Sequence, residues 1–360
     1  MKPRLADLAA HAGVSEATVS RVLNGKPGVS ESTRHAVLTA LDLFGYERPA
    51  RLSPRTAGLV GLIVPELDNP VFPRFAQAVE TALVEHRYTP VLCTLTPGGV
   101  HEDDYVQLLI SRGVAGIIIA SGIHAISGTD PARYRRLREQ NLPIVLVNGY
   151  LEGVDAPFVS TDDAAAVDMA VAHLVARGHR RIGLAMGPER YVPVQRKVAA
   201  FYAAVRTHIS DPSLSPSEVD ALVQHGHFRV EGGAAAAHAL IERGATAIIC
   251  GSDVMALGAV RAARDRGLRV PEDVSVVGCD DSPLVEFTDP PLTTVRAPLQ
   301  AMAQAAVRAL LSDIAGEHSP RAEYVFRPEL VVRGSTGPAQ ENDPLDSGTT
   351  VQHGVPGCNA

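Results

Sequence analysis

The side chains best suited to catalysis or metal binding are few. The only close histidine pair, His225 and His227, lacks further ligands in a convincing pattern, and the end of a surface strand explains its spacing more simply. The chain also has no G-x-S-x-G motif, no Walker P-loop and no G-x-G-x-x-G after its first predicted strand. We therefore expect no enzyme, no bound metal and no cofactor.

Four cysteines are the other reactive side chains. They lie far apart, no two form a C-x-x-C pair, and three sit in apolar or tight-turn contexts that suit a small buried hydrophobic residue. We expect reduced thiols, as in a cytoplasmic protein. The four are Cys93, Cys250, Cys279 and Cys358.

The composition indicates a folded cytoplasmic protein with an uneven charge. Of 360 residues, 46% are hydrophobic and 20% are charged. No apolar stretch approaches the roughly 20 residues of a membrane span, and the N-terminus has no signal-peptide pattern. The net charge is −7, yet residues 1–55 carry eight basic and five acidic residues. A basic head on an acidic body suits local contact with phosphates.

The head is predicted to contain three short helices. Leu5, Leu8 and Ala9 form a helical stripe that ends at His11, and the segment 12–14 makes a tight turn at Gly13. In the second helix Ser15 is the N-cap, Val19, Val22 and Leu23 face inward, and Asn24-Gly25 ends it. A third helix begins near Ser30 and ends at Gly45. Two helices joined by a short glycine turn are typical of a helix-turn-helix.

From Leu59 onward, short apolar runs alternate with helical stretches. One set of runs is 59–64, 90–95, 116–120 and 144–147, and a second is 182–185, 247–250 and 274–277. Such runs predict parallel strands buried on both faces, and hence two α/β lobes with a ligand cleft at the carboxyl ends of their strands. The predicted fold is an all-α helix-turn-helix head followed by a two-lobed α/β core.

The predicted domains follow from these patterns. The head covers residues 1–46, a linker 47–58, the core 59–335 and a disordered tail 336–360. Lobe 1 is expected at about 59–160 and 293–320, and lobe 2 at about 161–290 and 321–335. The tail has no leucine heptads, so we expect no tail-driven tetramer.

The head strongly resembles the helix-turn-helix of the LacI/GalR family of bacterial regulators. The match runs from Leu5 to Leu8-Ala9 and from Ala12-Gly13-Val14-Ser15 through Asn24-Gly25. Motifs of the core are similar too, and they occur in the family's order over about residues 3–335. These motifs are 65–70, 178–182, 252–258, 276–281 and 290–295. The resemblance implies a periplasmic-binding-protein-like core that dimerises.

The resemblance implies which residues of the head contact DNA. Glu16 and Ala17 stand where relatives carry base-specifying residues, and Arg21 lies one turn further along the same face. Arginine can contact guanine bidentately and glutamate can accept from cytosine N4, although Glu16 is equally an ordinary first-turn residue. The hydroxyl residues are expected to cap helices or touch phosphate. The candidate DNA-binding residues are Ser15, Glu16, Ala17, Thr18, Ser20, Arg21, Asn24 and Leu52.

Leu52 lies in the predicted linker between the head and the core. In relatives this segment carries a short helix that wedges a leucine into the minor groove, and Leu52 is the candidate wedge. Here the segment is a few residues shorter, and Pro54 disfavours helix at Ser53. A plain basic linker is the alternative.

In the core, relatives bind a small molecule, usually a sugar, between the lobes. Sugar hydroxyls and C–H faces call for Asp, Asn and Arg groups with aromatic platforms. Either Arg196 or Lys197 fills the cationic role, whereas Asp253 is equally well explained as a helix N-cap before Val254–Ala263, and Asp280 as a turn residue. The implied effector-binding residues are Asp68, Asn69, Phe72, Asn148, Tyr150, Arg196, Lys197, Ser252, Asp253 and Asp280.

These observations favour a homodimeric repressor that binds a pseudo-palindromic DNA operator and responds to a sugar, with no membrane partner. The segments 45–49, 90–94 and 98–100 are similar to actinobacterial regulators of maltose and maltodextrin use, so maltose is the expected effector. Two alternatives remain: a regulator whose non-sugar ligand or partner protein tightens DNA binding, and a sugar-binding protein of the periplasmic type without a DNA role.

Overall fold

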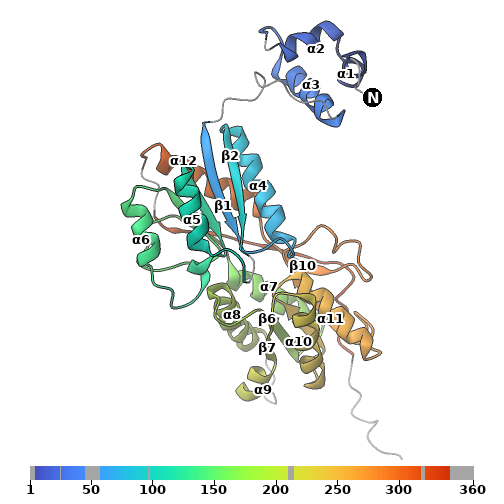
Figure 1. Cartoon of the computed structure of the whole chain (residues 1–360). Helices are drawn as coiled ribbons and strands as arrows, with labels where there is room; N and C mark the ends of the chain where they lie inside the picture. Colours follow the sequence, from blue (N-terminus) through green and yellow to red (C-terminus); the bar gives the residue numbers. More distant parts are fainter. Residues whose placement is uncertain are drawn as a thin grey trace, which may run out of the picture. The chain divides into compact units, whose positions relative to one another are not determined.

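Three short helices open the described part of the chain, and two six-stranded sheets with their covering helices follow (Figure 1). The chain divides into two units, Met1–Leu59 with Leu83–Thr89 and Val60–Ala82 with Pro90 onward, and most of both sheets lies in the second unit. The computed structural model describes residues 5–24, 26–44, 57–95, 98–209, 215–317 and 321–340.

The three helices of the head pack around a small apolar core. They are α1 (Leu5–His11), α2 (Glu16–Leu23) and α3 (Glu31–Leu43), so the third helix ends before the predicted Gly45, which lies outside the described residues. Gly13 supplies the positive φ of +65° that the turn between α1 and α2 requires. The core consists of Leu8, Ala9, Val19, Val22, Val37, Ala40 and Leu41.

Lobe 1 is built on a sheet with strand order β11-β5-β4-β3-β1-β2, in which β1, β3, β4, β5 and β11 pair in parallel. Its strands are β1 (Gly58–Val64), β2 (Tyr88–Thr94), β3 (Gly116–Ala120), β4 (Ile144–Val147), β5 (Phe158–Thr161) and β11 (Glu323–Phe326). Its helices are α4 (Val71–Glu85), α5 (Glu102–Ser111), the 3₁₀ turn η2 (Ile123–Ala125), α6 (Ala132–Glu139) and α12 (Leu299–Ile314).

Lobe 2 repeats this plan with strand order β12-β10-β9-β8-β6-β7, and only β12 runs antiparallel among its recorded pairings. Its strands are β6 (Ile182–Met186), β7 (Val223–His225), β8 (Ala247–Cys250), β9 (Ser275–Cys279), β10 (Thr293–Arg296) and β12 (Glu329–Val331). Its helices are α7 (Asp163–Ala176), α8 (Val192–His208), α9 (Pro216–Ala221), α10 (Val230–Glu242) and α11 (Asp253–Asp265).

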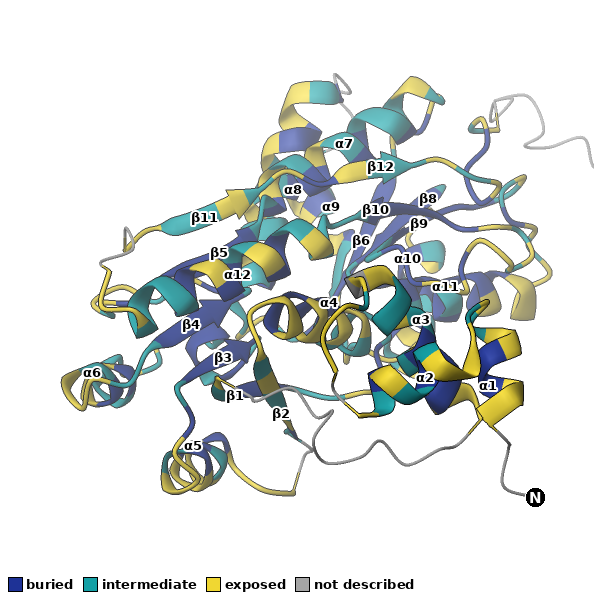
Figure 2. Ribbon diagram, turned by 90° about the horizontal axis from the view of Figure 1, so that it is seen from above, coloured by how far each residue is buried: buried dark blue, intermediate teal, exposed yellow. Residues whose placement is uncertain are grey.

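The central strands of both sheets are buried on both faces, as their apolar runs predict (Figure 2). The edge strands β2, β7, β11 and β12 are partly exposed, so the expected burial of the run 90–95 is wrong. Every residue of β3 is buried. Two glycines let helices approach the sheet of lobe 1, because a Cβ on Gly61 would lie 2.5 Å from Leu109 of α5 and one on Gly116 would lie 2.8 Å from Leu310 of α12. Gly61 pairs with Ile117, the residue after Gly116, so the two glycines face opposite sides of the sheet. Helices therefore cover both faces.

The predicted division of the lobes is wrong at two places after residue 290. β10, expected in lobe 1, lies in the sheet of lobe 2, and β11, expected in lobe 2, is an edge strand of lobe 1. These short strands carry no long apolar run, so only their pairing partners decide the sheet to which they belong. The chain thus passes between the lobes three times, at 161–163, 296–299 and 326–329.

The predicted disorder from residue 336 is also wrong for its first five residues. Thr336 is buried, and its hydroxyl lies 2.9 Å from Nε2 of His173. The Gly337 N–H donates to Ser275 Oγ at 3.0 Å, and Gln340 donates to the carbonyl of Glu272 at 3.1 Å. Residues 335–340 therefore form a strap against lobe 2, which the proline- and glycine-rich composition hides. Residues 341–360 lie outside the described part of the chain.

Cys93, Cys250 and Cys279 are free thiols, whereas Cys358 lies outside the described residues. Burial raises the pKa of all three thiols. No helix in the described ranges is both long and apolar enough to cross a membrane.

Candidate nucleic-acid interface and interlobe site

The second helix of the head presents a polar face to solvent. Val19 and Val22 are buried, while Glu16, Ala17 and Arg21 are exposed. At 100° per residue, Glu16, Ala17, Ser20, Arg21 and Asn24 fall within an arc of about 140°, and Thr18 lies about 60° beyond it. One side of α2 therefore anchors the helix in the head, and the other carries the groups predicted to contact DNA.

A polar hollow of about 280 Å³ lies beside this face, where the N-termini of α2 and α3 come together. In each helix the serine N-cap accepts a hydrogen bond from the N–H three residues on, Thr18 N to Ser15 Oγ and Thr33 N to Ser30 Oγ, both at 3.2 Å. Arg21 also lines the hollow. Two helix N-termini, four hydroxyls and a guanidinium suit a phosphate group.

Ser30 and Thr33 were not among the predicted DNA contacts. Their signal in the sequence is an N-cap serine followed three residues later by threonine, which repeats the pair Ser15 and Thr18. Asn24 is placed differently, because its Nδ2 donates to the Ser20 carbonyl at 2.8 Å at the end of α2. Leu52 lies outside the described residues, so its role as a wedge stays a prediction.

The predicted effector residues of lobe 1 gather after β1 and β4. Asp68 is exposed and Phe72 is half-buried, whereas Asn69 is buried and its side chain hydrogen-bonds to Asp280 of lobe 2. Asn148 has a positive φ of +63° and donates through Nδ2 to Ser121 Oγ at 3.3 Å. The other aromatic candidate, Tyr150, is exposed and its ring packs 4.8 Å from that of Phe158.

The two cationic candidates, adjacent on α8, have different partners. Arg196 makes a bidentate ion pair with Glu323 of lobe 1, with N–O distances of 2.6 and 3.0 Å. Lys197 forms an ion pair with Asp163 inside lobe 2, and both side chains are largely buried. Burial opposes the charged amine, but the charge and hydrogen bond of Asp163, together with the nearby Cys279 and Asp280, outweigh it and raise the pKa of Lys197.

Asp280 is the acidic group at the centre of this region. It follows β9 with a φ of +112°, and Asn69 hydrogen-bonds to its carboxylate. Burial, followed by the nearby charge of Asp253, raises the pKa of Asp280, and the positive charge of Lys197 opposes that rise. Asn69, Lys197 and Asp280, three of the predicted effector residues, thus lie close together where the two lobes meet, and their contact with an effector stays a prediction.

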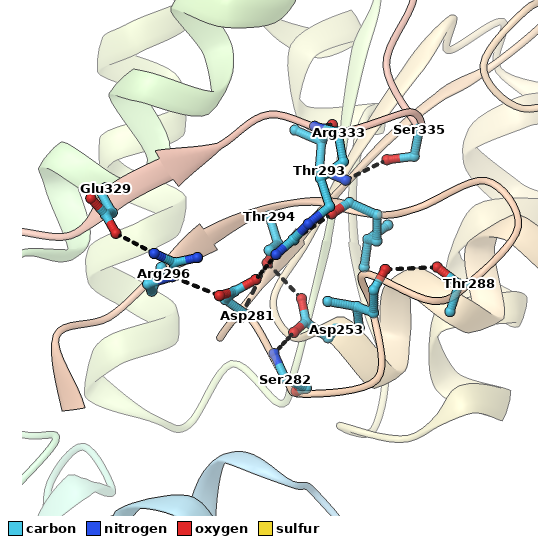
Figure 3. Close-up of polar contacts among 12 residues, drawn as sticks. Asp253, Asp281, Ser282, Thr288, Thr293, Thr294, Arg296, Glu329, Arg333 and Ser335 are labelled. Atoms are coloured by element: carbon cyan, nitrogen blue, oxygen red, sulfur yellow. Dashed lines mark hydrogen bonds and ion pairs between the residues drawn. The ribbon is translucent and has the colours of Figure 1, made fainter. Parts of the chain in front are cut away.

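Ser252 and Asp253 have structural roles at the start of α11, and Figure 3 shows the contacts of Asp253. The N-cap is Ser252, whose Oγ accepts from Met255 N at 3.3 Å, so the alternative prediction of Asp253 as the N-cap is wrong. Asp253 instead accepts from the Ser282 N–H and from the Thr294 hydroxyl, each at 2.6 Å. Burial, with the neighbouring charge of Asp281, raises its pKa to about 6. Both of its carboxylate oxygens are already engaged within lobe 2.

A second carboxylate, Asp281, organises the chain crossing beside it (Figure 3). Its two oxygens pair with Arg296 at 2.6 Å and with Arg333 at 2.7 Å. Arg296 also reaches Glu329 at 2.7 Å. This cluster ties the turn after β9 to the end of β10, the start of β12 and the segment after β12, so we assign it to the architecture of lobe 2.

Four further side chains near the lobe junction carry no motif that would have identified them. The rings of Tyr191 and Phe228 are 6.5 Å apart, and Phe228 lies so close to Gly187 that a Cβ there would be 2.1 Å from its ring. These rings form an apolar platform of the kind that sugar faces contact. Glu66 of lobe 1 and Arg229 of lobe 2 also interact: burial raises the pKa of Glu66, and the charge of Arg229 partly offsets that rise.

No cluster of three or more metal-ligating side chains occurs in the part of the chain that the structure describes. His225 ends β7, where its Nδ1 lies 2.9 Å from the Gly187 carbonyl, and His227 is exposed. The pair thus stands at a surface strand end.

Comparisons with known proteins agree with both halves of this description. A model of bacterial regulatory proteins of the lacI family matches residues 4–48, and a model of a periplasmic binding protein-like domain matches residues 171–336. The HTH-type transcriptional regulator MalR of Streptomyces coelicolor is 62% identical over 340 residues, which cover 94% of this chain and 98% of that protein.

Two solved structures show the same architecture. The transcriptional regulator CelR in complex with cellobiose has a TM-score of 0.66 and 32% identity, and the match covers 92% of this chain and 99% of that chain. The lac repressor dimer bound to operator and the anti-inducer ONPF also has a TM-score of 0.66, with 26% identity over 94% of this chain and all of that chain.

Proposed function

Since the chain belongs to the LacI family of bacterial transcriptional regulators, we propose that it is a repressor whose affinity for operator DNA is set by a small sugar held between its lobes. The observation that carries the proposal is that Asn69 of lobe 1 comes together with Lys197 and Asp280 of lobe 2. The paired rings of Tyr191 and Phe228 in lobe 2 add an apolar platform, and hydroxyl-binding groups with aromatic rings suit a sugar better than an apolar ligand.

On DNA, α2 is proposed to enter the major groove with Glu16, Ala17 and Arg21 toward the base edges. Their exposure on one face of the helix supports this role. The hydroxyls of Ser15, Thr18, Ser30 and Thr33 are proposed to contact the phosphate backbone, because they surround the hollow at the two helix N-termini. Base contacts then select the sequence, and phosphate contacts fix the register.

A homodimer on a pseudo-palindromic operator is the proposed assembly. The solved relative on operator DNA is a dimer. In this chain Leu284 and Phe287, which follow β9, are 73% and 78% exposed, and large apolar side chains this exposed suit an interface. A twofold dimer presents two copies of α2 to two half-sites.

Maltose or a maltodextrin is the proposed effector. The relative at 62% identity is named MalR, and the CelR structure holds cellobiose, itself a disaccharide. We further propose that the protein acts in the cytoplasm and has no catalytic role.

Fluorescence anisotropy tests this function directly. Purified protein is titrated into a labelled palindromic segment from upstream of its own gene at fixed salt, with a scrambled duplex as control. Maltose, maltotriose, cellobiose and ribose are added in turn. We expect tight binding to the palindrome alone, weakened by maltose or maltotriose. Tightening by a ligand would instead establish a corepressor, and equal binding to both duplexes would refute operator recognition.

A further inference from the structure

One ion pair joins the two lobes directly beside Lys197, a residue proposed to hold sugar. Arg196 lies on α8 of lobe 2, and Glu323 is the first residue of β11 in lobe 1. Arg196 Nη1 donates to Glu323 Oε1 at 2.6 Å, and Nη2 donates to Oε2 at 3.0 Å. The Arg196 side chain is 35% exposed and the Glu323 side chain 18%. Bidentate arginine–carboxylate pairs are both stronger and more directional than single contacts.

The neighbouring residue shows that this contact is specific to one side chain. Lys197 is directed to Asp163 of its own lobe, so the two cations of α8 have separate tasks. The carboxylate of Glu323 raises the pKa of Arg196, and the guanidinium outweighs burial and lowers the pKa of Glu323. Each partner therefore favours the charged form of the other across the lobe boundary.

The pair lies away from the hinge between the lobes, so it can restrict the rotation of one lobe relative to the other. Glu323 lies three residues before the end of β11, hence about 10 Å along the strand from the crossing at 326–329. A contact away from a hinge resists rotation about that hinge more effectively than one within it. Other contacts that bridge the lobes include the hydrogen bond of Asn69 to Asp280, Arg74 Nη1 to the Asp281 carbonyl at 2.6 Å and Ser127 N to the Arg190 carbonyl at 2.8 Å. Among the described residues, Arg196 and Glu323 form the only direct ion pair between the lobes.

We propose that Arg196 and Glu323 are positioning residues that hold the lobes together before a ligand arrives, and so set the affinity for the ligand. Arg196 then acts on the sugar through the lobe angle and not by direct contact. A ligand that binds the closed arrangement has an apparent affinity proportional to the closed fraction, so losing the tie weakens binding. For its ligand readout, the inference rests on the proposed sugar response.

The first experiment measures the lobe distance without any ligand. Leu108→Cys on α5 and Arg261→Cys on α11 place labels on exposed positions of lobes 1 and 2, in a Cys358→Ser background. The remaining thiols react slowly because burial raises their pKa. Single-molecule energy transfer is recorded on full-length protein diluted with unlabelled protein, so that each dimer carries one labelled chain.

We expect Glu323→Gln and Arg196→Gln to broaden the distance distribution toward longer values, and the double exchange Arg196→Glu with Glu323→Arg to narrow it again. The matched control is Asp313→Asn, which breaks the partly buried pair with Arg138 inside lobe 1 and should leave the distance unchanged. An unchanged distribution in both single variants would overturn the proposal. Circular dichroism checks that each variant is folded. If Glu323→Gln does not fold, Arg196→Gln alone tests the proposal.

The second experiment measures maltose binding by titration calorimetry on the same variants. The expected loss for Glu323→Gln is about fivefold in Kd, recovered in the charge exchange, with no change for Asp313→Asn. If the ion pair affected folding alone, Glu323→Gln would lower Tm and leave the Kd for maltose unchanged, and that result would contradict the proposed role. If maltose fails to bind the wild type as well, the sugar assignment fails, while the distance measurement still decides whether the tie exists.

Discussion

The DNA-facing helix and the junction of the lobes satisfy their charged groups in opposite ways. Glu16 and Arg21 on α2 are exposed, and within the described part of the head neither forms an ion pair. At the junction, Lys197 pairs with Asp163, and Arg196 pairs with Glu323, 127 residues away. A surface prepared for an outside partner leaves its charges available, whereas the charges at the junction are paired within lobe 2 or between the two lobes.

This difference implies different energetics of binding. DNA adds contacts to groups on the head that water alone now covers, so counterion release and hydrogen bonding both favour association. A ligand entering between the lobes must replace contacts that already exist, such as that of Asn69 with Asp280. Affinity at the junction is then a difference between two sets of contacts.

The largest expected effect tests whether the junction is structural as well as functional. Asp253→Ala leaves the Ser282 N–H and the Thr294 hydroxyl buried without their acceptor, which costs about 3 kcal/mol in the free energy of unfolding. Urea denaturation followed by circular dichroism measures it. Asp265→Ala, on the exposed end of the same helix, is the control and should change stability by less than about 0.5 kcal/mol. Equal losses in the two variants would contradict the assignment.

A substitution on the head is expected to have a smaller effect, and it should change DNA binding without changing stability. Arg21→Ala is predicted to lose about 2 kcal/mol of operator binding and to relax the preference among operator variants, because an arginine that reads a base supplies discrimination. Its free energy of unfolding should stay at the wild-type value, since the side chain is exposed. Anisotropy on single-base operator variants measures the preference, and an unaltered ranking of those variants would remove Arg21 from base recognition.

The free energy of unfolding should depend on pH through His173, a residue of the core. Burial, with the charges of Arg177 and His179, lowers the pKa of His173 to about 4, below its unfolded value. The folded state therefore binds fewer protons, and the stability contribution, complete above about pH 6.5, is lost as the pH falls toward 4. Since His173 is only partly buried, we expect wild type to lose about 1 kcal/mol more than His173→Gln between pH 7.5 and 5. Parallel urea-midpoint curves for the two proteins would contradict this sign.

The smallest effect separates phosphate contacts from base contacts within the head. Thr33→Val removes one hydroxyl from the hollow between α2 and α3 while keeping the shape of the side chain. It should weaken binding to operator and to scrambled duplex by the same factor, about two- to threefold, because phosphate contacts carry no sequence information. Anisotropy on both duplexes provides the comparison. A loss confined to the operator would place Thr33 among the base-reading residues.

The head and the lobe junction also differ in how well the sequence predicts them. The Ser15 cap, the start of the third helix near Ser30 and the inward-facing Val19 and Val22 are determined within one or two turns of chain, and these predictions are confirmed. The family and the fold class are confirmed too. The exposure of Glu16 and Arg21 is equally local, although their contacts with DNA stay predictions.

The junction could be predicted only in part. The family motifs put Asn69, Lys197 and Asp280 among the candidate effector residues of the two lobes, but the partner of Arg196 is an acidic residue on a four-residue strand far along the chain, and no local pattern identifies it. The same holds for β10 and β11, which were assigned to the wrong lobes. Residues that depend on long-range pairing therefore require the three-dimensional structure.

The strap of residues 335–340 has a practical consequence for protein engineering. Ser335 and Gly337 contact Val276 and Ser275 at the amino end of β9, whereas Asp280 follows the carboxyl end of that strand. The two ends of a five-residue strand are roughly 15 Å apart. A fluorescent protein fused directly after Gln340 would thus be attached at the edge of the sheet remote from the proposed sugar site, and its linker would pull on a segment that His173 and Ser275 hold to lobe 2. Such a fusion would report on the repressor in cells while leaving ligand access free.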